Sequence, residues 1–385
     1  MFPFTSTSEE LEFRDAVRAF ASREVAPIAL QHDRSGESPI DVHHRFWREG
    51  FAETLLPHPD GMRSPYLVRF CIAAEELAYA CPAIASLIML PLFFNRLLLQ
   101  LLTEPARSEF RAQLSSNPTI TSFAATEQES GSDLMLMGAR GERLDGGYLL
   151  NGRKQFSTNL RHASRVIVVA RTGASGERAA SAMTWFLVPT ADAGVTIGDR
   201  WDTLGLRAID VSPLELHDAR IPESGRLGAE GRGIWLMSEA LPQSRTGICA
   251  IAVGIARRAR DEVLAYGSKR RLYGDKLYKL QDYRFRIADM EKEIAAARAL
   301  TYVSAAKYDQ GLSNTKEASI AKLNAGQVVM RVTEAASVML GGIGYTQESV
   351  VEKLFRDARH VAIVEGTDPT HKELIFADLI RKGGY

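Results

Sequence analysis

The periodicity of the apolar residues changes twice along this chain of 385 residues, and the two changes restrict the folds that it can adopt. From Ser8 to about Leu114, apolar residues recur every three or four positions, a spacing that predicts amphipathic helices. Between about Thr119 and Leu227, short β-branched runs alternate with turn-forming residues, which predicts an antiparallel β domain. Helical periodicity returns at Gly231. This order of elements predicts successive α, β and α domains.

The length of the chain also favours several domains, because a single hydrophobic core stops growing at roughly 250 residues and 45% of this chain is hydrophobic. We therefore predict an α+β multidomain protein. Its expected parts are an α-helical N-terminal domain at residues 1–118, a central antiparallel β domain at 119–228 and a C-terminal α-helical bundle domain at 229–385.

The C-terminal domain is expected to be a four-helix bundle. Long helical patterns occur at about 234–266, 281–310 and 315–340, and a shorter one follows Asp368. Gly311 supplies a stop for the second pattern. Helices of this length, joined by short loops, bury their apolar faces most simply against one another in a bundle.

Charge and cysteine content argue against several classes of partner and site. Lysine plus arginine equals aspartate plus glutamate, 47 of each, so no net field favours nucleic acid, a membrane surface or an acidic partner. The three cysteines form no CxxC pair, and neither a metal site nor a disulfide framework is expected.

The N-terminal sequence and the most apolar run indicate a cytoplasmic protein. The first fifteen residues lack the basic region and apolar core of a signal peptide, and they are too acidic for a mitochondrial transit peptide. The apolar run from Ser86 to Leu102 contains a proline and three polar residues, whereas a membrane span needs about 20 mostly uninterrupted apolar residues. We therefore expect a buried or cavity-lining helix there.

Two motifs in the C-terminal part allow several interpretations. The sequence LGGIGYTQE at 340–348 follows a helical pattern, so it is no dinucleotide fingerprint; a tight turn or a close approach to a phosphate both suit its glycines. The sequence KRRLYGDK at 269–276 suits a solvated helix end better than a nucleic-acid patch. Phosphate binding by Arg270 or Arg271 is a third alternative.

Two motifs in the β region suit a loop that touches a flat ring or a phosphate. The sequence ATEQESGSD at 125–133 places small hydroxyl residues and a glycine just after an expected strand. The sequence KQFSTN at 154–159 places an aromatic residue beside hydroxyls on the next strand. Taken singly, each motif is equally compatible with a turn or with core packing.

The sequence VAIVEGTDP at 361–369 places one carboxylate, Glu365, between an apolar run and an expected helix start. Asp368 can cap a helix whose first position is Pro369, which would leave Glu365 in a loop fixed on both sides. An exposed acid at a helix entry is the alternative, because acidic residues are common near helix starts.

Taken in order, these motifs resemble those of the acyl-CoA dehydrogenase family over essentially all 385 residues. The matching segments are AEELAYACP, ATEQESGSD, LNGRKQFSTN, GLRAIDVSPLELHDARIP, GRGIWLM, KRRLYGDKLYKLQ, IADMEKEIAAARAL, ASIAKLNA, LGGIGY, KLFRDAR and VEGT. The resemblance implies the same α, β and four-helix-bundle domains, FAD as cofactor and a homotetramer built from dimers.

The resemblance also implies which residues hold the FAD. In the family, one group approaches the flavin and its pyrophosphate, a second covers the ring, and a third comes from a neighbouring subunit to the adenosine diphosphate half. By position, the residues near the flavin and its pyrophosphate are Phe123, Ala125, Thr126 and Ser132, and those that cover the ring are Phe156 and Thr158. The residues for the adenosine diphosphate half are Arg270, Tyr273, Gln281, Gly341, Gly342 and Gly344. Thr367 is a further expected cofactor contact.

Glu365 aligns with the catalytic base of most of the family. A thioester α proton is weakly acidic, and a positioned carboxylate can remove it while hydride leaves Cβ for the flavin N5. The backbone N–H of Glu365 and a ribityl hydroxyl of FAD would then hydrogen-bond the thioester carbonyl. Arg245 aligns with an arginine near the pantetheine, and Gly366 is a further expected substrate contact.

Departures from the family pattern concern the substrate rather than the flavin. Pro369 replaces a frequent glutamine, Pro242 a frequent aspartate, and the first loop motif lacks one proline and one glycine. Phe93 and Phe94 lie in the helix that lines the acyl pocket, where bulky rings would shorten it. We expect a short, branched or functionalised acyl group; simple core packing of both rings is an equal alternative.

The function that these motifs imply is α,β-dehydrogenation of an acyl thioester, with electrons passed to an electron-transfer flavoprotein. Two alternatives remain open: a flavin enzyme reoxidised by oxygen, as oxidase or monooxygenase, and a non-catalytic subunit of a mixed oligomer. Whether coenzyme A or an acyl carrier protein carries the thioester is also open.

Overall fold

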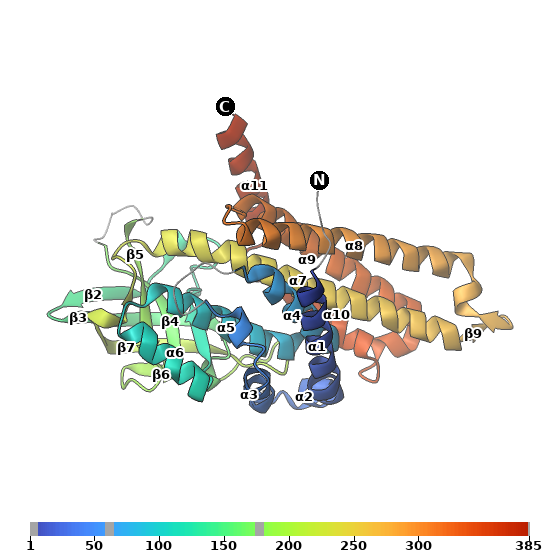
Figure 1. Cartoon of the computed structure of the whole chain (residues 1–385), viewed down its shortest axis with the longest axis horizontal. Helices are drawn as coiled ribbons and strands as arrows, with labels where there is room; N and C mark the ends of the chain where they lie inside the picture. The colour runs from blue at the N-terminus through green and yellow to red at the C-terminus, as the bar shows by residue number, and fades with distance from the viewer. Residues whose placement is uncertain (1–6, 58–64, 174–180, 384–385) are drawn as a thin grey trace.

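The computed structural model of the chain describes residues 7–57, 65–173 and 181–383. A β domain forms one end of the molecule, a layer of helices from the N-terminal part lies beside it, and long C-terminal helices extend to the other end (Figure 1). The order of α, β and α parts along the chain is the one predicted from periodicity. The domain boundaries at 118/119 and 228/229 stay a prediction.

The N-terminal part is helical and largely buried. Its first helix begins with a capping box, in which Thr7 Oγ1 accepts from the backbone N–H of Glu10 and the Glu10 carboxylate accepts from that of Thr7. The helices are α1 (Ser8–Phe20), α2 (Ala29–Ser35), α3 (Ile40–Arg48), α4 (Leu67–Ala80), α5 (Pro82–Leu101) and α6 (Ala106–Ser116).

Helix α5 contains the apolar run that raised the question of a membrane span. Among the described residues it alone is long and apolar enough to cross a membrane, and 78% of its apolar window is buried inside the protein. Its polar side chains are buried and bonded: Asn95 donates to the carbonyl of Thr119, and Arg96 donates to that of Leu55. The expected buried helix is therefore confirmed.

The central sheet is mixed, whereas an antiparallel domain was predicted. Most neighbouring strands are antiparallel, but β1 pairs with β4 in parallel and β2 meets β4 in parallel at its end. The parallel pairs arise because β4, which follows the β2–β3 hairpin along the chain, lies beside β1 and the start of β2. The strands are β1 (Thr121–Ala124), β2 (Arg140–Leu144), β3 (Gly147–Thr158), β4 (Arg165–Arg171), β5 (Met183–Pro189), β6 (Val195–Ile197), β7 (Val211–Pro222) and β8 (Arg226–Leu227), in the order β6-β7-β3-β2-β4-β5-β8.

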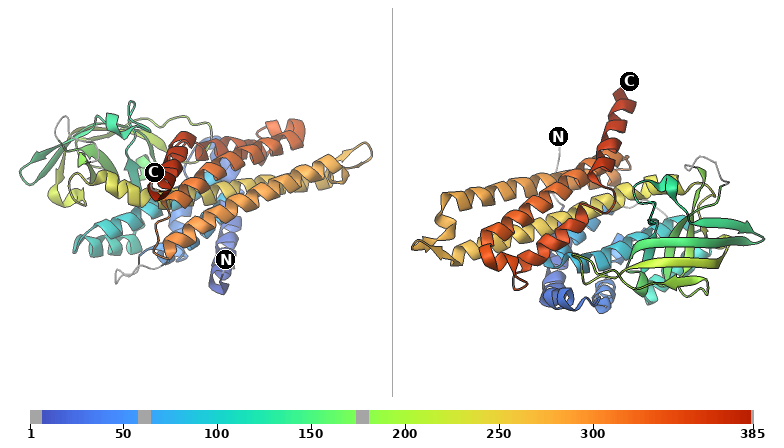
Figure 2. Two further views of the ribbon diagram at one scale, coloured as in Figure 1. Left: turned by 90° about the horizontal axis from the view of Figure 1, so that it is seen from above. Right: turned by 180° about the vertical axis from the view of Figure 1, so that it is seen from behind.

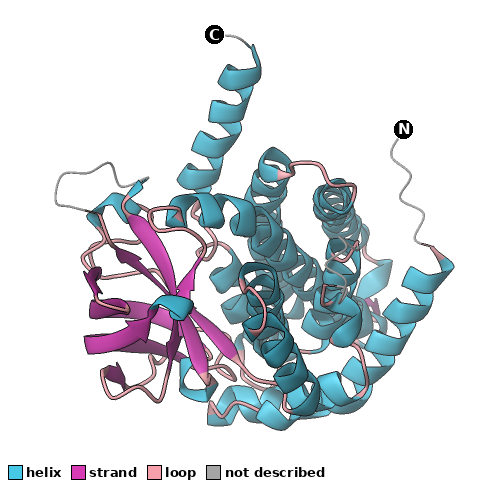
Figure 3. Ribbon diagram, turned by 60° about the vertical axis from the view of Figure 1, so that its left-hand side comes forward, coloured by secondary structure: helices cyan, strands magenta, loops and turns pink. Residues whose placement is uncertain are grey.

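The C-terminal part is a bundle of long helices that run side by side away from the sheet (Figure 2). Helices α7 and α8 are joined through a two-stranded hairpin, and α11 projects from the body (Figure 3). The elements are α7 (Gly233–Lys269), β9 (Arg271–Leu272), β10 (Asp275–Lys276), α8 (Gln281–Asp309), α9 (Thr315–Leu340), α10 (Val350–Val361) and α11 (Asp368–Gly383).

The identity of the fourth bundle helix differs from the prediction. The helix that packs on α7 and α9 is α10, which was not predicted, and the expected helix after Asp368 is the projecting α11. The signal for α10 was present in the sequence, because Val351, Leu354, Ala358 and Val361 are buried at helical spacing. The charged residues between them obscured it.

Glycines set the distance between α4 and α7. A Cβ at Gly254 would lie 2.4 Å from the backbone carbonyl oxygen of Glu75, and a Cβ at Gly247 would lie 2.7 Å from the ring of Phe70. The two glycines are seven residues apart, so they lie on one face of α7. The side chains that form the wall between these helices are placed by this close approach.

Gly254→Ala is therefore expected to destabilise the protein by about 1–3 kcal/mol, because α4 must move away even though alanine favours the helix. Gly326→Ala in α9 is the matched control, since its nearest contact would be an ordinary 3.6 Å to Ala362. The control should be neutral or more stable by up to about 1 kcal/mol. Urea unfolding measures both; equal effects of the two changes would contradict the glycine contact.

Candidate active site

The loop between α10 and α11 carries Glu365 in a left-handed backbone conformation. Its φ is +59°, and the next residue, Gly366, has φ +107°. A non-glycine residue with positive φ is strained, so surrounding contacts must hold it. A Cβ at position 366 would lie 3.3 Å from His371 Nε2, which also restricts that position.

Buried donors from α7, α9 and α11 hold this loop. Arg245 Nε of α7 donates to the backbone carbonyl of Glu365 at 2.9 Å, and Ser244 Oγ donates to its Oε2 at 2.8 Å. Lys322 Nζ of α9 lies 3.4 Å from the carbonyl oxygen of Gly366, and His371 Nε2 lies 3.1 Å from the same atom. Both carbonyls of the strained pair are thus bound from the bundle side.

Helix α10, which leads into the loop, is itself anchored to the rest of the molecule. Asp357 accepts from the backbone N–H of Leu206 at 2.7 Å, and the same carboxylate pairs with the buried Lys353. Arg356 forms an ion pair with Asp33 of α2 at 2.6 Å. These contacts fix the direction from which the chain enters the Glu365 loop.

The electrostatics of the loop balance burial against nearby cations. Burial raises the pKa of Glu365, while the hydrogen bond from Ser244 and the charges of Arg245 and Lys322 oppose that rise. Burial lowers the pKa of both cations and, with their charge, lowers that of His371 to about 4. His371 is therefore neutral at pH 7 and donates to the Gly366 carbonyl through Nε2.

Ser244 also lines a small apolar pocket between α4, α5 and α7. The space inside is about 10 Å³, and a single water needs about 10–15 Å³ by the same measure. The pocket is therefore nearly closed. The other residues that line it are Phe70, Met89, Leu90, Phe93, Gly247, Ile248 and Ile251.

Phe93 and Phe94, predicted as substrate contacts, separate into two environments. Phe93 lines the pocket beside Ser244. Phe94 does not: its ring stacks on Phe123 of β1, with centroids 5.4 Å apart and planes 8° apart. The two phenylalanines touch edge to face at 5.4 Å. Ring contacts therefore extend from the pocket that Ser244 and Phe93 line to Phe123 of the β domain.

The structure brings together the predicted flavin residues of the β domain. The backbone N–H of Gln155 donates to the carbonyl of Thr126, and Ser122 Oγ donates to that of Thr158, so the ends of β1 and β3 are adjacent. Phe156 has φ +57°, and the residue is 54% exposed. It packs at 5.5 Å against the exposed Trp201, which the sequence analysis did not identify.

A buried ion pair secures the predicted flavin loop, which includes Ala125 and Ser132. Lys154 Nζ donates to Glu127 Oε1 at 2.6 Å and to the carbonyl of Ala125 at 3.2 Å. Glu127 also accepts from the backbone N–H groups of Gly138 and Ala139. Burial lowers the pKa of Lys154 to about 8, although Glu127 favours its charged form.

The residues predicted for the adenosine diphosphate half lie at the opposite end of the molecule. Arg270 and Tyr273 lie in the connection between α7 and α8, and Gln281 is the first residue of α8; Figure 1 shows this end of the two helices far from the sheet. The turn at 341–345 follows α9 and lies at the same end, because α9 runs antiparallel to α8. Tyr273 is 94% exposed, and a Cβ at Gly341 or Gly342 would meet nothing within 4 Å. Gly344, in contrast, is buried against Ser337.

The structure corrects the expected role of Asp368 as the cap of the helix after Glu365. The carbonyl of Thr367 accepts the first helical N–H of α11, that of His371, so Asp368 is the first helical residue and not the cap. The Asp368 carboxylate instead accepts from Gln327 of α9 at 3.0 Å. Pro369 is exposed.

Ser244, Lys322 and His371 had no sequence signal, because only the packing of α7, α9 and α11 brings them to the loop.

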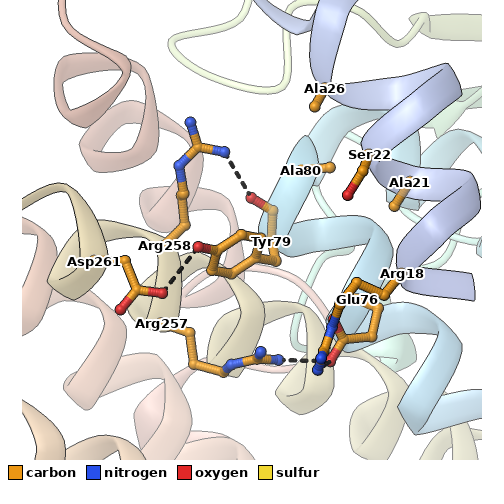
Figure 4. A pocket seen from close by; sticks show the side chains of 10 residues that line it. All are labelled: Arg18, Ala21, Ser22, Ala26, Glu76, Tyr79, Ala80, Arg257, Arg258 and Asp261. Atoms are coloured by element: carbon orange, nitrogen blue, oxygen red, sulfur yellow. Dashed lines mark hydrogen bonds and ion pairs between the residues drawn. The ribbon is translucent and has the colours of Figure 1, made fainter. Parts of the chain in front are cut away.

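A larger cleft, about 370 Å³, lies between α1, α4 and α7 (Figure 4). None of its lining residues was predicted to bind cofactor or substrate, and the charged groups drawn in it bind one another or neighbouring side chains. The pairs are Arg18 and Arg257 with Glu76, Arg258 with Glu262, and Tyr79 with Asp261. Among the described residues, no group of three or more histidine, cysteine or acidic side chains could hold a metal ion.

Comparison with known proteins gives a consistent result along the chain. Three family models match: "Acyl-CoA dehydrogenase, N-terminal domain" at residues 7–117, "middle domain" at 122–219 and "C-terminal domain" at 231–380. Probable acyl-CoA dehydrogenase YngJ of Bacillus subtilis is 32% identical over 98% of this chain and 100% of that protein. The mitochondrial short-chain specific acyl-CoA dehydrogenase of Bos taurus is 33% identical over 96% and 89%. The structure of butyryl-CoA dehydrogenase from Megasphaera elsdenii has a TM-score of 0.92 and 29% identity, with 99% and 100% coverage.

Because the pKa of Glu365 is raised in the folded protein, ionisation of its carboxyl should lower the stability of the fold. A carboxyl with a raised folded-state pKa stabilises the fold below its unfolded pKa, near 4.5, and loses that contribution as pH rises through the folded value. Glu365→Gln, which stays neutral, should therefore gain stability relative to wild type as pH rises from 5 to 8. Thermal melts of both proteins across that range measure the gap; a gap that shrinks with rising pH would contradict the burial.

Proposed function

Because this chain belongs to the acyl-CoA dehydrogenase family, we propose that it oxidises the Cα–Cβ bond of an acyl thioester, with Glu365 as the base for the Cα proton. It is an oxidoreductase of the class that acts on CH–CH groups. The observation that carries the role of Glu365 concerns Ser244, which both binds its carboxylate and lines the apolar pocket. An acyl chain in that pocket would lie next to the carboxylate.

The loop contacts suit proton abstraction from a weak carbon acid. Burial gives the Glu365 carboxylate a higher proton affinity than one in water, while the charges of Arg245 and Lys322 oppose that rise in its pKa and favour the ionised form. The hydrogen bond from Arg245 to the Glu365 carbonyl fixes the backbone, so the carboxylate keeps its place when it takes the proton. The apolar lining of the pocket excludes water from the reacting carbons.

The residues at the ends of β1 and β3 suit a flavin. The exposed rings of Phe156 and Trp201 offer flat apolar surface, and the strained backbone of Phe156 is typical of functional positions. The Lys154 and Glu127 pair holds the loop to which Thr126 and Ser132 belong. FAD bound there would accept the hydride from Cβ. Thr367, whose hydroxyl lies 3.3 Å from that of Thr370, is a further proposed cofactor contact.

The separation of the two groups of cofactor residues supports an assembly in which one subunit completes the site of another. One group lies at the sheet, and the other at the far end of the bundle. A homotetramer built from dimers would bring Arg270, Tyr273 and Gln281 of one chain to the sheet end of the next. Exposed apolar residues at the far end, such as Phe285 and Tyr345, suit burial in that contact.

The closed pocket supports a short acyl substrate. Phe93 and Phe70 leave space for about one water, so any acyl chain must displace side chains that line the pocket, and a long chain must displace more of them. Two similar proteins are named for short-chain substrates, the bovine enzyme and the bacterial butyryl-CoA dehydrogenase. Coenzyme A and an acyl carrier protein are both compatible carriers, because Arg245 would approach the pantetheine that they share.

An electron-transfer flavoprotein is the proposed acceptor, and reoxidation by oxygen is the alternative. Anaerobic reduction by substrate followed by an air pulse separates them. Slow return of the yellow colour supports the dehydrogenase; rapid return with peroxide supports an oxidase. A purified protein without flavin would instead support the alternative that the chain is a non-catalytic subunit of a mixed oligomer.

Glu365→Gln should keep its flavin and lose reduction by substrate, because the amide accepts no proton. We expect the rate of anaerobic flavin bleaching to fall by about 10³-fold, within the range found for general bases. The measurement uses stopped-flow absorbance with butyryl-, hexanoyl- and decanoyl-thioesters on both carriers. Rapid reduction of the variant would remove Glu365 from the reaction.

Phe93→Ala should shift the preference toward longer chains, because it opens the floor of the pocket. The ratio of kcat/KM for hexanoyl- over butyryl-thioester should rise by about 10-fold or more. Leu98→Ala is the control: it removes a fully buried side chain from the same helix that does not line the pocket, and should lower stability without changing the ratio. A wild-type preference for decanoyl over butyryl chains would refute the short-acyl proposal.

A further inference from the structure

Two adjacent residues of α7 hold the two parts of Glu365. Arg245 binds the backbone carbonyl at 2.9 Å, and Ser244 binds carboxylate Oε2 at 2.8 Å. The arginine contact would persist with any side chain at position 365, whereas the serine contact depends on the carboxylate. Of these two α7 contacts, only the hydrogen bond of Ser244 therefore depends on whether the Glu365 carboxyl is ionised or protonated.

The Ser244 hydroxyl has a second acceptor within reach, the carbonyl oxygen of Leu241 at 3.2 Å on its own helix. A hydroxyl carries one proton and two lone pairs. When the Glu365 carboxylate is ionised, Ser244 can donate to it. When the acid is protonated, its O–H can donate to Ser244 Oγ, and the serine proton can turn to Leu241. The same side chain thus binds both protonation states without moving a heavy atom.

We propose that Ser244 is a positioning residue whose hydroxyl holds the Glu365 carboxylate against the apolar pocket and sets the pH range in which that carboxylate accepts a proton. This inference rests on the role of Glu365 proposed above. Ser244 touches the base and lines the pocket, and it acts on the reaction through Glu365.

The loop has other charged and titratable neighbours, and their effects remain when Ser244 is changed. They come from α7, α9, α10 and α11 and are Arg245, Cys249, Lys322, His360, Asp368 and His371. Arg245 and Lys322 lower the pKa of Glu365, and burial raises it. His360 and His371 both have a pKa lowered to about 4 by burial, so they do not titrate near neutral pH.

The sign of the effect follows from the direction of the hydrogen bond. A donor to the ionised carboxylate stabilises that form, so the bond from Ser244 lowers the pKa of Glu365. Ser244→Ala removes the donor and should raise the pKa. The base would then be protonated up to a higher pH, and flavin reduction would lose rate on the acidic side.

The test is the pH profile of anaerobic flavin reduction at saturating thioester, measured in single turnovers with the purified holoprotein. The probe is butyryl-CoA, or whichever thioester of the panel above reduces wild type fastest. In Ser244→Ala we expect the acid limb to move up by about one pH unit, which costs about 10-fold in rate below the limb. At high pH the rate should recover, apart from a smaller loss through poorer orientation of the carboxylate.

Matched variants separate positioning from general damage. Ser244→Thr keeps the hydroxyl and should restore the wild-type limb. Ser238→Ala removes another α7 hydroxyl, one that donates to the Trp235 carbonyl, and should leave the limb in place. Flavin content and melting temperature are recorded for each variant. Should Ser244→Ala fail to fold, Ser244→Cys, with its weak donor, is expected to show the same shift.

An acid limb that stays at the wild-type pH in Ser244→Ala or Ser244→Cys would overturn the inference, and so would a shift that Ser244→Thr fails to reverse. These results differ from failure of the proposed function. If Glu365→Gln retains rapid reduction, or if no thioester reduces the wild type, the function itself is wrong. If Glu365→Gln abolishes reduction but the acid limb stays at the wild-type pH in the Ser244 variants, only the proposed role of Ser244 is wrong.

Discussion

A buried hydrogen bond from the Arg245 guanidinium to the Glu365 carbonyl ties the functional loop to the longest helix of the protein. Burial of that cation is costly unless its donors are used, and the loop carbonyl accepts from one of them. The bond also supports a residue in an unfavourable backbone conformation, since Glu365 has φ +59°. One hydrogen bond therefore stabilises both the buried guanidinium and the strained loop backbone.

Helix α7 can serve this loop because it contacts helices of the N-terminal part, the sheet and the other bundle helices. Gly233 at its start approaches Met183 of the sheet, Gly247 and Gly254 admit α4, and the rest packs on α8, α9 and α10. Close approach by glycine leaves little freedom for the helix to rotate, so Ser244 and Arg245 are presented at a defined angle. A rigid support suits a carboxylate that must stay in place while it takes a proton.

Much of the fold was predictable because periodicity is a local property. The α, β and α order, the buried helix α5 and the long helices α7, α8 and α9 all follow from the spacing of apolar residues. Helix α10 was missed because charged residues interrupt its four buried positions, although the spacing is helical. The parallel pairing of β1 with β4 was missed because strand pairing depends on which segments meet across long distances in the chain.

The sequence alone determined the domain order, the resemblance of its motifs and the presence of an acid between an apolar run and an expected helix start. Only the tertiary structure decided what surrounds that acid. Ser244, Lys322 and His371 lie on three helices, from 6 to 121 residues away along the chain, and they meet Glu365 or Gly366 because α7, α9 and α11 converge there. Apolar spacing records which face of a helix is buried, but not which polar groups of other helices that burial brings together.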